Sequence, residues 1–292
     1  MAPGSGRLTA EGSQNPADKI ATMNAQPLPS RYWQDLKTTD FQRLAQDGIL
    51  QRTVAVLPVA ATEQHGPHLP LGVDTFLLEA VLEQALERLP PDLPVLVLPT
   101  QAVGFSPEHT AFAGTLTFSA ETLIRIWTEI GEAVARTGIR RLLLLNGHGG
   151  QVGVMDIVGR DLRSRLGLTV WSSSWFSLPQ PPAVAALFPA REHRYGIHAG
   201  DTETSMVLAL RPDLVDMSAA RDFASASEAR AGKYTLLADG RSAKLSWAMQ
   251  DYNPEGAVGN AAAATPEKGR AVIDAAAAQL ALLIGEIAAQ AL

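Results

Sequence analysis

The sequence predicts a three-layer α/β/α fold in which a mainly parallel sheet is covered by helices on both faces. Two observations lead to this prediction. Short apolar runs alternate along the chain with segments of helical periodicity, which is the pattern of repeated βα units. The chain also has 292 residues, of which 46% are hydrophobic, and this is enough for a large buried core.

The elements follow in order along the chain. Strands are expected at residues 53–58, 94–99, 141–146 and 168–173. After the first strand, helical spacing places on one face Leu78, Val81, Leu82, Ala85 and Leu89. Further helices are expected over residues 120–137, from 151, over 201–210 and from Pro266. Residues 213–260 lack periodicity, so we expect them to be irregular and to reach over a site.

The N-terminus differs in character from the rest of the chain. Residues 1–28 are rich in Gly, Ser, Pro, Asn and Ala without periodicity, and we expect them to form a flexible N-terminal leader. No internal repeat and no later break in composition follows. Residues 29–292 are therefore predicted to form a single domain.

The composition excludes several classes of function. The formal net charge is −6, and no basic cluster could track a phosphate backbone, so we expect no nucleic-acid partner. Because the chain has no cysteine, a metal would be held by nitrogen and oxygen ligands. No apolar run approaches the roughly 20 residues that span a bilayer, and residues 1–25 lack a signal-peptide core. We expect a cytoplasmic protein without a membrane partner.

The histidines gather where a ligand site is expected. In open parallel sheets, ligands bind at the carboxyl ends of the strands, where loops converge. All the histidines fall in loops or at the ends of predicted elements: His65, His68, His109, His148, His193 and His198. This placement favours function over core packing.

The segment EQHGPHLPLGVD follows the first predicted strand. Glu63 and His65 lie two residues apart and would point the same way in an extended chain, so both could address one ion. Asp74 begins the next helix, where its carboxylate could bridge two metal ions. The structural alternative is that Asp74 caps the helix and the other two are polar loop residues.

The segment NGHGG, residues 146–150, follows a buried run of leucines. Its glycines allow a sharp turn that leaves His148 exposed at the carboxyl edge of the sheet. A phosphate-binding loop is the competing interpretation, because Gly147-x-Gly149 lies between a strand and a helix. That interpretation lacks a glycine at the sixth position, which is Val152, and a carboxylate at the end of the next strand.

The remaining candidates lie in HAGDTETS, GFSPEH and the end of the fourth strand. Glu203 could be a further metal ligand or could favour the helix dipole, and His198 could protonate a departing nitrogen. Glu108 and His109 are candidates for substrate contact or for plain loop structure. Trp175 could line a pocket or pack in the core. The chain has no Gly-x-Ser-x-Gly or His-Glu-x-x-His motif, so neither serine hydrolase nor that metalloprotease chemistry is indicated.

Four motifs in order, EQHGPHLPLGVD, GFSPEHTAFAGTLTFS, NGHGG and HAGDTETS, resemble the creatininase, or creatinine amidohydrolase, family over about residues 50–275. The resemblance implies a creatininase-like fold, two divalent metal ions per chain (Zn, Mn or Fe), hydrolysis of amide-like bonds and a homo-oligomer, usually a hexamer. By motif position, one metal would be held by Glu63, Asp74 and His148. His65 and the bridging Asp74 would hold the second, and His198 would be catalytic.

Two positions depart from creatininases proper. An acidic residue that ligates the second metal in those enzymes is replaced by Gly150, and Glu203 is the candidate substitute. The acid that precedes the catalytic histidine is Ile197. The NGHGG and HAG-x-x-ET forms are more similar to branches that include a formamidopyrimidine deformylase and the mycofactocin peptide-cleaving enzyme, although Gln151 departs from the asparagine often found there.

We therefore expect a metal-dependent amidohydrolase that cleaves a non-peptide amide, cyclic and formyl amides included, through a metal-activated water. Two alternatives stay open. One is a peptide-cleaving relative of the mycofactocin type, and the other is a non-catalytic relative that binds a metabolite, for which Gly150 and Ile197 are the motivation.

Overall fold

The computed structural model describes residues 28–237 and 242–291, so the predicted leader lies outside the described residues except for residue 28. The main sheet has four parallel strands in the order β2-β1-β3-β4. They are β1 (Val54–Val59), β2 (Val95–Val97), β3 (Arg141–Asn146) and β4 (Thr169–Ser174). Each falls on a predicted run. β2 is the shortest, and the two prolines that flank it, Pro94 and Pro99, have no N–H to offer a ladder.

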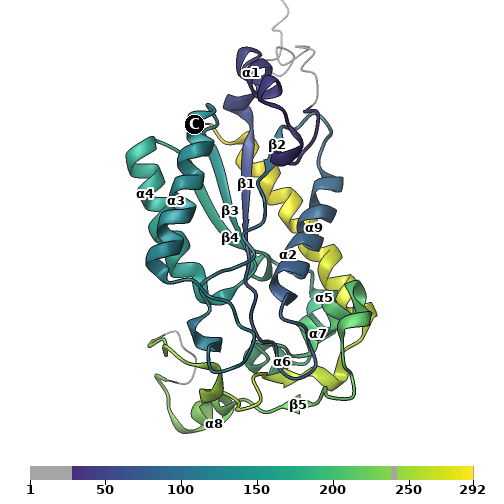
Figure 1. The fold of residues 1–292 in the computed structure, drawn as a ribbon. Helices are drawn as coiled ribbons and strands as arrows, with labels where there is room; N and C mark the ends of the chain where they lie inside the picture. Colours follow the sequence, from purple (N-terminus) through teal and green to yellow (C-terminus); the bar gives the residue numbers. More distant parts are fainter. Residues whose placement is uncertain (1–27, 238–241, 292) are drawn as a thin grey trace, which may run out of the picture.

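One face of this sheet is covered by three helices (Figure 1). They are α2 (Val73–Arg88), α7 (Asp201–Leu210) and α9 (Pro266–Ala289), as the periodicity predicts. Buried side chains of these helices form one apolar cluster with alternate side chains of the two central strands, namely Val54, Val56, Leu143 and Leu145. This face carries the larger part of the apolar core.

The opposite face is covered by a second set of helices. They are α1 (Thr38–Gln46), α3 (Ala120–Arg136) and α4 (Val152–Leu166). The strand residues that point toward them are Ala55, Leu57, Leu142 and Leu144. Because side chains alternate along a strand, a sheet buried on both faces needs continuous apolar runs, which explains the leucines of β3. The predicted three-layer α/β/α fold is confirmed.

Helix α9 is by length and composition apolar enough to cross a bilayer. Here it packs against α2 and α7, and its inward residues include Val272, Leu280 and Ile284, all buried. The core helix of a soluble protein passes the same test. The expected absence of a membrane partner stays a prediction.

Short elements between β4 and α9 gather beyond the carboxyl end of the main sheet (Figure 1). They are α5 (Pro182–Ala185), α6 (Ala190–Tyr195), β5 (Asp222–Phe223), α8 (Ala226–Lys233) and β6 (Gly259–Asn260). β5 and β6 form a small antiparallel ladder. Residues 213–260 are thus mostly irregular, as predicted. His193 lies inside α6, a helix that the sequence does not predict, and not in a loop.

Candidate metal centre

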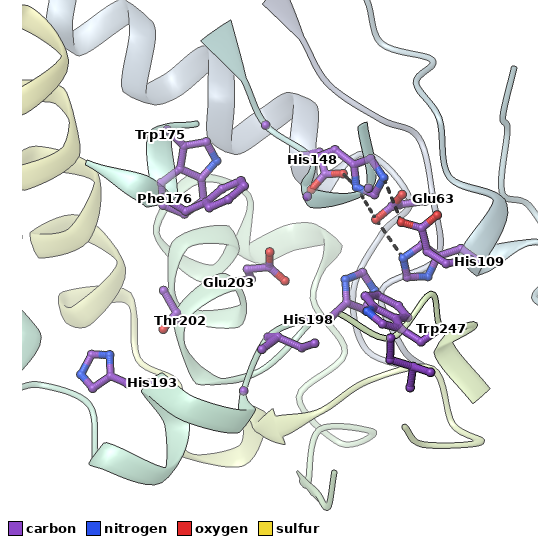
Figure 2. A pocket seen from close by; sticks show the side chains of 18 of the residues that line it. Glu63, His109, His148, Trp175, Phe176, His193, His198, Thr202, Glu203 and Trp247 are labelled. Carbon is purple, nitrogen blue, oxygen red and sulfur yellow. Dashed lines mark ion pairs between the residues drawn. The ribbon is translucent and has the colours of Figure 1, made fainter. Parts of the chain in front are cut away.

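The carboxyl edge of the sheet brings the first and second motifs together (Figure 2). β1 and β3 are neighbours in parallel register, with Val59 opposite Asn146. The chain that continues beyond each strand therefore emerges at the same edge. Glu63 comes from the first of these segments and His148 from the second, and both are buried.

Two residues explain why the turn after β3 reaches the start of α2. A Cβ on Gly147 would lie 3.0 Å from the carbonyl oxygen of Asp74 and 3.3 Å from the Cβ of Leu78. Glycine therefore permits the close approach of the two segments. The Asn146 side chain accepts the N–H of His148 at 3.0 Å and donates to the His148 carbonyl at 2.7 Å. These bonds hold the turn that carries the imidazole.

The ligand atoms of the cluster lie within a few ångströms of each other. His148 Nδ1 is 3.2 Å from Glu63 Oε1 and 3.5 Å from Asp74 Oδ2. On the other side, His65 Nε2 is 3.5 Å from Asp74 Oδ1 and 4.0 Å from Glu203 Oε2. The carboxylate of Asp74 thus lies between the two histidines, with one oxygen facing each.

These residues form groups with the dimensions of a metal site. In each group, one ligand atom per residue lies within 4.8 Å of the others. The groups are Glu63–Asp74–His148, His65–Asp74–Glu203 and Glu63–His65–His198. The first two share Asp74, which is the arrangement that a bridging carboxylate requires.

Three buried polar atoms of the cluster lack a hydrogen-bond partner, and they are Glu63 Oε2, His65 Nε2 and Asp74 Oδ2. A buried polar atom without a partner costs about 1–3 kcal/mol, and more when it is charged. All three belong to residue types that bind Zn²⁺, Mn²⁺ or Fe²⁺. A divalent cation would supply the missing partner, so the residues fit a metal.

The outer nitrogens of the two histidines are also arranged as in metal sites. His65 Nδ1 lies 3.0 Å from the Glu63 carbonyl, and His148 Nε2 lies 2.9 Å from the Phe105 carbonyl. Since a carbonyl only accepts, each of these nitrogens carries the hydrogen. With a metal bound, the other nitrogen of each ring would then present its lone pair to the ion, and metal-bound histidines are commonly oriented in this way.

The electrostatics of the cluster reflect several acids in a confined space. Burial raises the pKa of Asp74, and the charge of Glu63 raises it further. Burial also raises the pKa of Glu203 to about 7. Burial alone would lower the pKa of His65, but the carboxylate of Asp74 close to its Nε2 outweighs burial and raises that pKa to about 9. Burial is likewise outweighed at His148, chiefly by Glu63, and its pKa lies well above the ordinary value. A divalent cation would take the place of these protons.

His198 has the opposite character. Burial lowers its pKa well below the ordinary value, and the neighbouring His65 lowers it further, so the ring is neutral. Its Nε2 lies 2.9 Å from the Gln64 carbonyl, so this nitrogen carries the hydrogen and Nδ1 keeps a lone pair. The next residue, Ala199, has a φ of 54°, and its N–H donates to Glu203 Oε2. Glu203 therefore fixes the turn that carries His198.

The predicted substrate residues lie on the same rim. Glu108 Oε1 is 3.4 Å from His148 Nε2, and His109 Nε2 is 3.3 Å from Glu63 Oε1. Trp175 follows β4 and is buried beside Phe176. All the predicted site residues except His65 line one cavity of about 1170 Å³; His65 lies beneath it in contact with Asp74.

The positions of Asp74, Glu203 and NGHGG bear on the alternatives of a helix cap, a helix-dipole effect and a phosphate-binding loop. Gly72, and not Asp74, is the N-cap of α2, and no side chain caps that end. The carboxylate of Asp74 is instead turned toward the histidines. Glu203 lies in the first turn of α7, where its charge favours the helix dipole, and its carboxylate also lies beside His65. The two roles are compatible. Four carboxylates line the cavity near NGHGG (Glu63, Asp74, Glu108 and Glu203), which disfavours binding of a phosphate there.

Sequence reasoning missed three residues that shape the site. Gln64 Nε2 lies 2.7 Å from His109 Nδ1. Trp247 stands edge-on to the His109 ring, with 6.2 Å between ring centroids. The buried Glu192 accepts the N–H groups of Asp201 and Asn260 at 2.7 and 2.9 Å.

Each missed residue left a different signal in the sequence. Gln64 could have been found, because it lies between two candidate ligands in EQHG. Glycines surround Glu192: a Cβ on Gly196, Gly200 or Gly259 would lie within 2.5 Å of its carboxylate. Trp247 lies in an aperiodic segment that offers no signal.

Known proteins place the chain among the creatininases. Residues 34–284 match the family model described as creatinine amidohydrolase. The chain is 37% identical over 163 residues to the mycofactocin precursor peptide peptidase of Mycobacterium tuberculosis, which covers 54% of this chain and 58% of that protein. It is 35% identical over 178 residues to the creatinine amidohydrolase of Pseudomonas putida, which covers 56% of this chain and 66% of that protein. The matched part thus spans about two thirds or less of each of these two relatives.

Solved structures agree with these matches. A crystal structure of creatinine amidohydrolase superposes with a TM-score of 0.70 at 27% identity and covers 90% of this chain and 100% of its own. A creatininase variant described as Zn-Zn type and a creatininase described as Mn each give a TM-score of 0.69 over 88% of this chain and 98% of theirs, at 28% and 27% identity. The chain therefore belongs to the creatininase family of amidohydrolases.

Proposed function

We propose that this chain is a metal-dependent amidohydrolase that cleaves a carbon–nitrogen bond with two divalent ions, Zn, Mn or Fe, at the carboxyl edge of the sheet. Glu63, Asp74 and His148 would hold one ion, and His65, Asp74 and Glu203 would hold the other. The observation that carries the proposal is the set of three buried atoms without a partner, one on each of Glu63, His65 and Asp74. The zinc and manganese forms of related creatininases support the choice of ions.

The chain's own side chains would manage the protons of the reaction. When bound, the ions supply an activated water and polarise the amide carbonyl. His198 is neutral, and its Nε2 hydrogen is bound to the Gln64 carbonyl. Its Nδ1 lone pair is therefore the group that can take up a proton and pass it to the departing nitrogen. With His198 only 6% exposed, bulk water does not compete for that proton.

The cavity favours a substrate larger than a small cyclic amide. Its volume of about 1170 Å³ is somewhat larger than that of most ligand pockets, which are commonly about 300–1,000 Å³. Trp175 and Phe176 lie on one side and Trp247 on the other, with Glu203 between them (Figure 2). Phe188 and Leu245 also line the cavity. Apolar walls on both sides of the reacting centre suit an amide with bulky apolar groups on both sides of the scissile bond. This favours the peptide-cleaving alternative over a cyclic or formyl amide.

The experiment that tests the proposal combines metal content with a substrate screen. Protein stripped with a chelator and reloaded with Zn²⁺, Mn²⁺ or Fe²⁺ would be assayed against creatinine, formamides, other cyclic amides and short apolar peptides. We expect about two ions per chain and the highest turnover with an apolar peptide. Glu63→Gln should lose metal and turnover, whereas Glu83→Gln, the same change at an exposed position of α2, should keep both.

Two results would reject parts of the proposal. A protein that binds no metal under any of these conditions would favour the non-catalytic, metabolite-binding relative. If the protein hydrolyses creatinine or a formamide but no peptide, the substrate is a small non-peptide amide. We also expect a cytoplasmic homo-oligomer, a hexamer by family resemblance, and sedimentation of the purified protein would measure its size.

A further inference from the structure

The environment of His148 differs on its two sides. Its Nδ1 faces the carboxylates of Glu63 and Asp74. Its Nε2 lies 2.9 Å from the Phe105 carbonyl, 3.4 Å from Ser106 Oγ and 3.4 Å from Glu108 Oε1. The Nε2 hydrogen is thus held between a carbonyl and a carboxylate, on the side opposite the candidate metal.

Glu108 reaches this position from a different loop. It lies in a short 3-10 turn, Pro107–His109, that follows β2 in the chain, and its side chain is only 9% exposed. A largely buried carboxylate needs a hydrogen-bonded or charged partner, because its loss of hydration is otherwise costly. His148 Nε2 is the charged partner within 4 Å that the described structure gives it.

The carboxylate of Glu108 occupies space that is free only because residue 150 is glycine. A Cβ on Gly150 would lie 2.0 Å from Glu108 Oε1 and 2.4 Å from His148 Nε2. The neighbouring Gly149 is different, since a Cβ there meets no atom of the described residues within 4 Å. The two adjacent glycines therefore have different constraints, and only Gly150 is required by what lies next to it.

We propose that Glu108 is a positioning residue for His148, and that Gly150 makes the room in which it acts. The carboxylate would hold the Nε2 hydrogen, fix the ring plane and increase the basicity of Nδ1 toward a metal. Partners of this kind typically change metal affinity by about 10–100-fold. Glu203 stays the candidate substitute for the acidic ligand that is missing at position 150, and Glu108 approaches the imidazole from its outer side. This inference rests on the proposed metal centre.

The test measures metal affinity by competition with a chelator, in the full-length chain and without substrate. Glu108→Ala should weaken metal binding by about 10–100-fold. Glu108→Gln, which can still accept a hydrogen bond, should recover part of that loss. Gly150→Ala should weaken binding at least as much, and Gly149→Ala should leave it unchanged. In the double variant Glu108→Ala/Gly150→Ala, the loss should be smaller than the product of the single losses, because both changes remove the same contact.

The outcomes separate this inference from the proposed function. If the unaltered chain binds two ions and Glu108→Ala binds them equally well, the positioning role is overturned and the metal centre stands. Equal losses in Gly149→Ala and Gly150→Ala would overturn the role of Gly150. If the unaltered chain binds no metal, both proposals fail. Thermal unfolding in the presence of chelator should be similar for the two Glu108 variants, which shows that a change in affinity is not a change in folding.

Discussion

The two sides of the cavity are built in different ways. The carboxylate and histidine cluster comes from short segments that follow β1 and β3 and from the first turns of α2 and α7, where register and close packing leave little freedom. The apolar wall with Leu245 and Trp247 comes from a long segment with few regular elements. In the proposed enzyme, the hydrolytic chemistry would thus be tied to the scaffold, whereas the choice of substrate would depend on a segment that can vary without disturbing the sheet.

The largest effect should come from the residue that joins the two metal groups. Asp74→Ala should abolish the binding of both ions and, with it, turnover. In the presence of chelator, the Asp74→Ala variant should unfold no more easily than the unaltered chain. Burial and the charge of Glu63 raise the pKa of the Asp74 carboxyl, so without metal its ionised form does not stabilise the fold. Elemental analysis and thermal unfolding would measure the two effects. Asp92→Ala, at an exposed position, is the control; full metal content in Asp74→Ala would contradict the bridging role.

Metal affinity should also depend steeply on pH. His65 has a pKa of about 9 and Glu203 a pKa of about 7, and both must lose their protons to bind a metal. Affinity should therefore rise as the pH increases from 6 toward 9, by about tenfold per pH unit for each proton released. Calorimetry in buffers with different ionisation enthalpies would count the protons. A pH-independent affinity in this window would contradict the assignment of His65 and Glu203 as ligands.

The opposite wall should affect substrate choice without affecting the metals. Trp247→Ala removes an aromatic surface beside His109, and we expect kcat/KM for an apolar peptide to fall by about 10–200-fold. Metal content and the hydrolysis of any small amide should change little. Parallel assays of both substrate types would measure the difference. An equal loss for small and large amides would mean that Trp247 supports the catalytic groups and not the substrate.

The smallest effect should arise at the turn that carries His198. Ala199 has a φ of 54°, a conformation that costs an L residue about 1–2 kcal/mol, part of which glycine would recover. Ala199→Gly should raise the free energy of unfolding by roughly 0.5 kcal/mol. Ala199→Val should lower it, because a branched side chain is more strained there. Urea unfolding would measure the free energy of unfolding of both variants. A lower value for Ala199→Gly would contradict the prediction that the backbone at Ala199 is strained.

The sequence predicts the scaffold better than the cavity. The strands and long helices follow from local periodicity, and Glu63, His65 and His148 could be placed because each follows a predicted strand. Glu192 and Trp247 could not, since their positions depend on contacts between distant segments that leave no periodic pattern. The relation of Glu108 to Gly150 is also non-local, because it is a competition for space between two loops.

The hydrogen bond between Gly66 and Gln64 has a consequence for the location of a proton. The N–H of Gly66, whose φ is 70°, can only donate, and it donates to Gln64 Oε1 at 2.9 Å. The amide orientation is then set, so its NH₂ group donates to His109 Nδ1. Burial lowers the pKa of His109 to about 4, so the ring is neutral and its hydrogen must sit on Nε2, facing Glu63.

His109 and His148 lie almost equally close to Glu63 Oε1, at 3.3 and 3.2 Å, yet they present opposite faces to it. Once a metal takes the place of its Nδ1 proton, His148 would present a lone pair, whereas His109 presents a hydrogen. His148 is therefore placed to coordinate a metal, and His109 to donate a hydrogen bond. The N–H of Gly66, which contacts neither ring, fixes the role of His109 through Gln64.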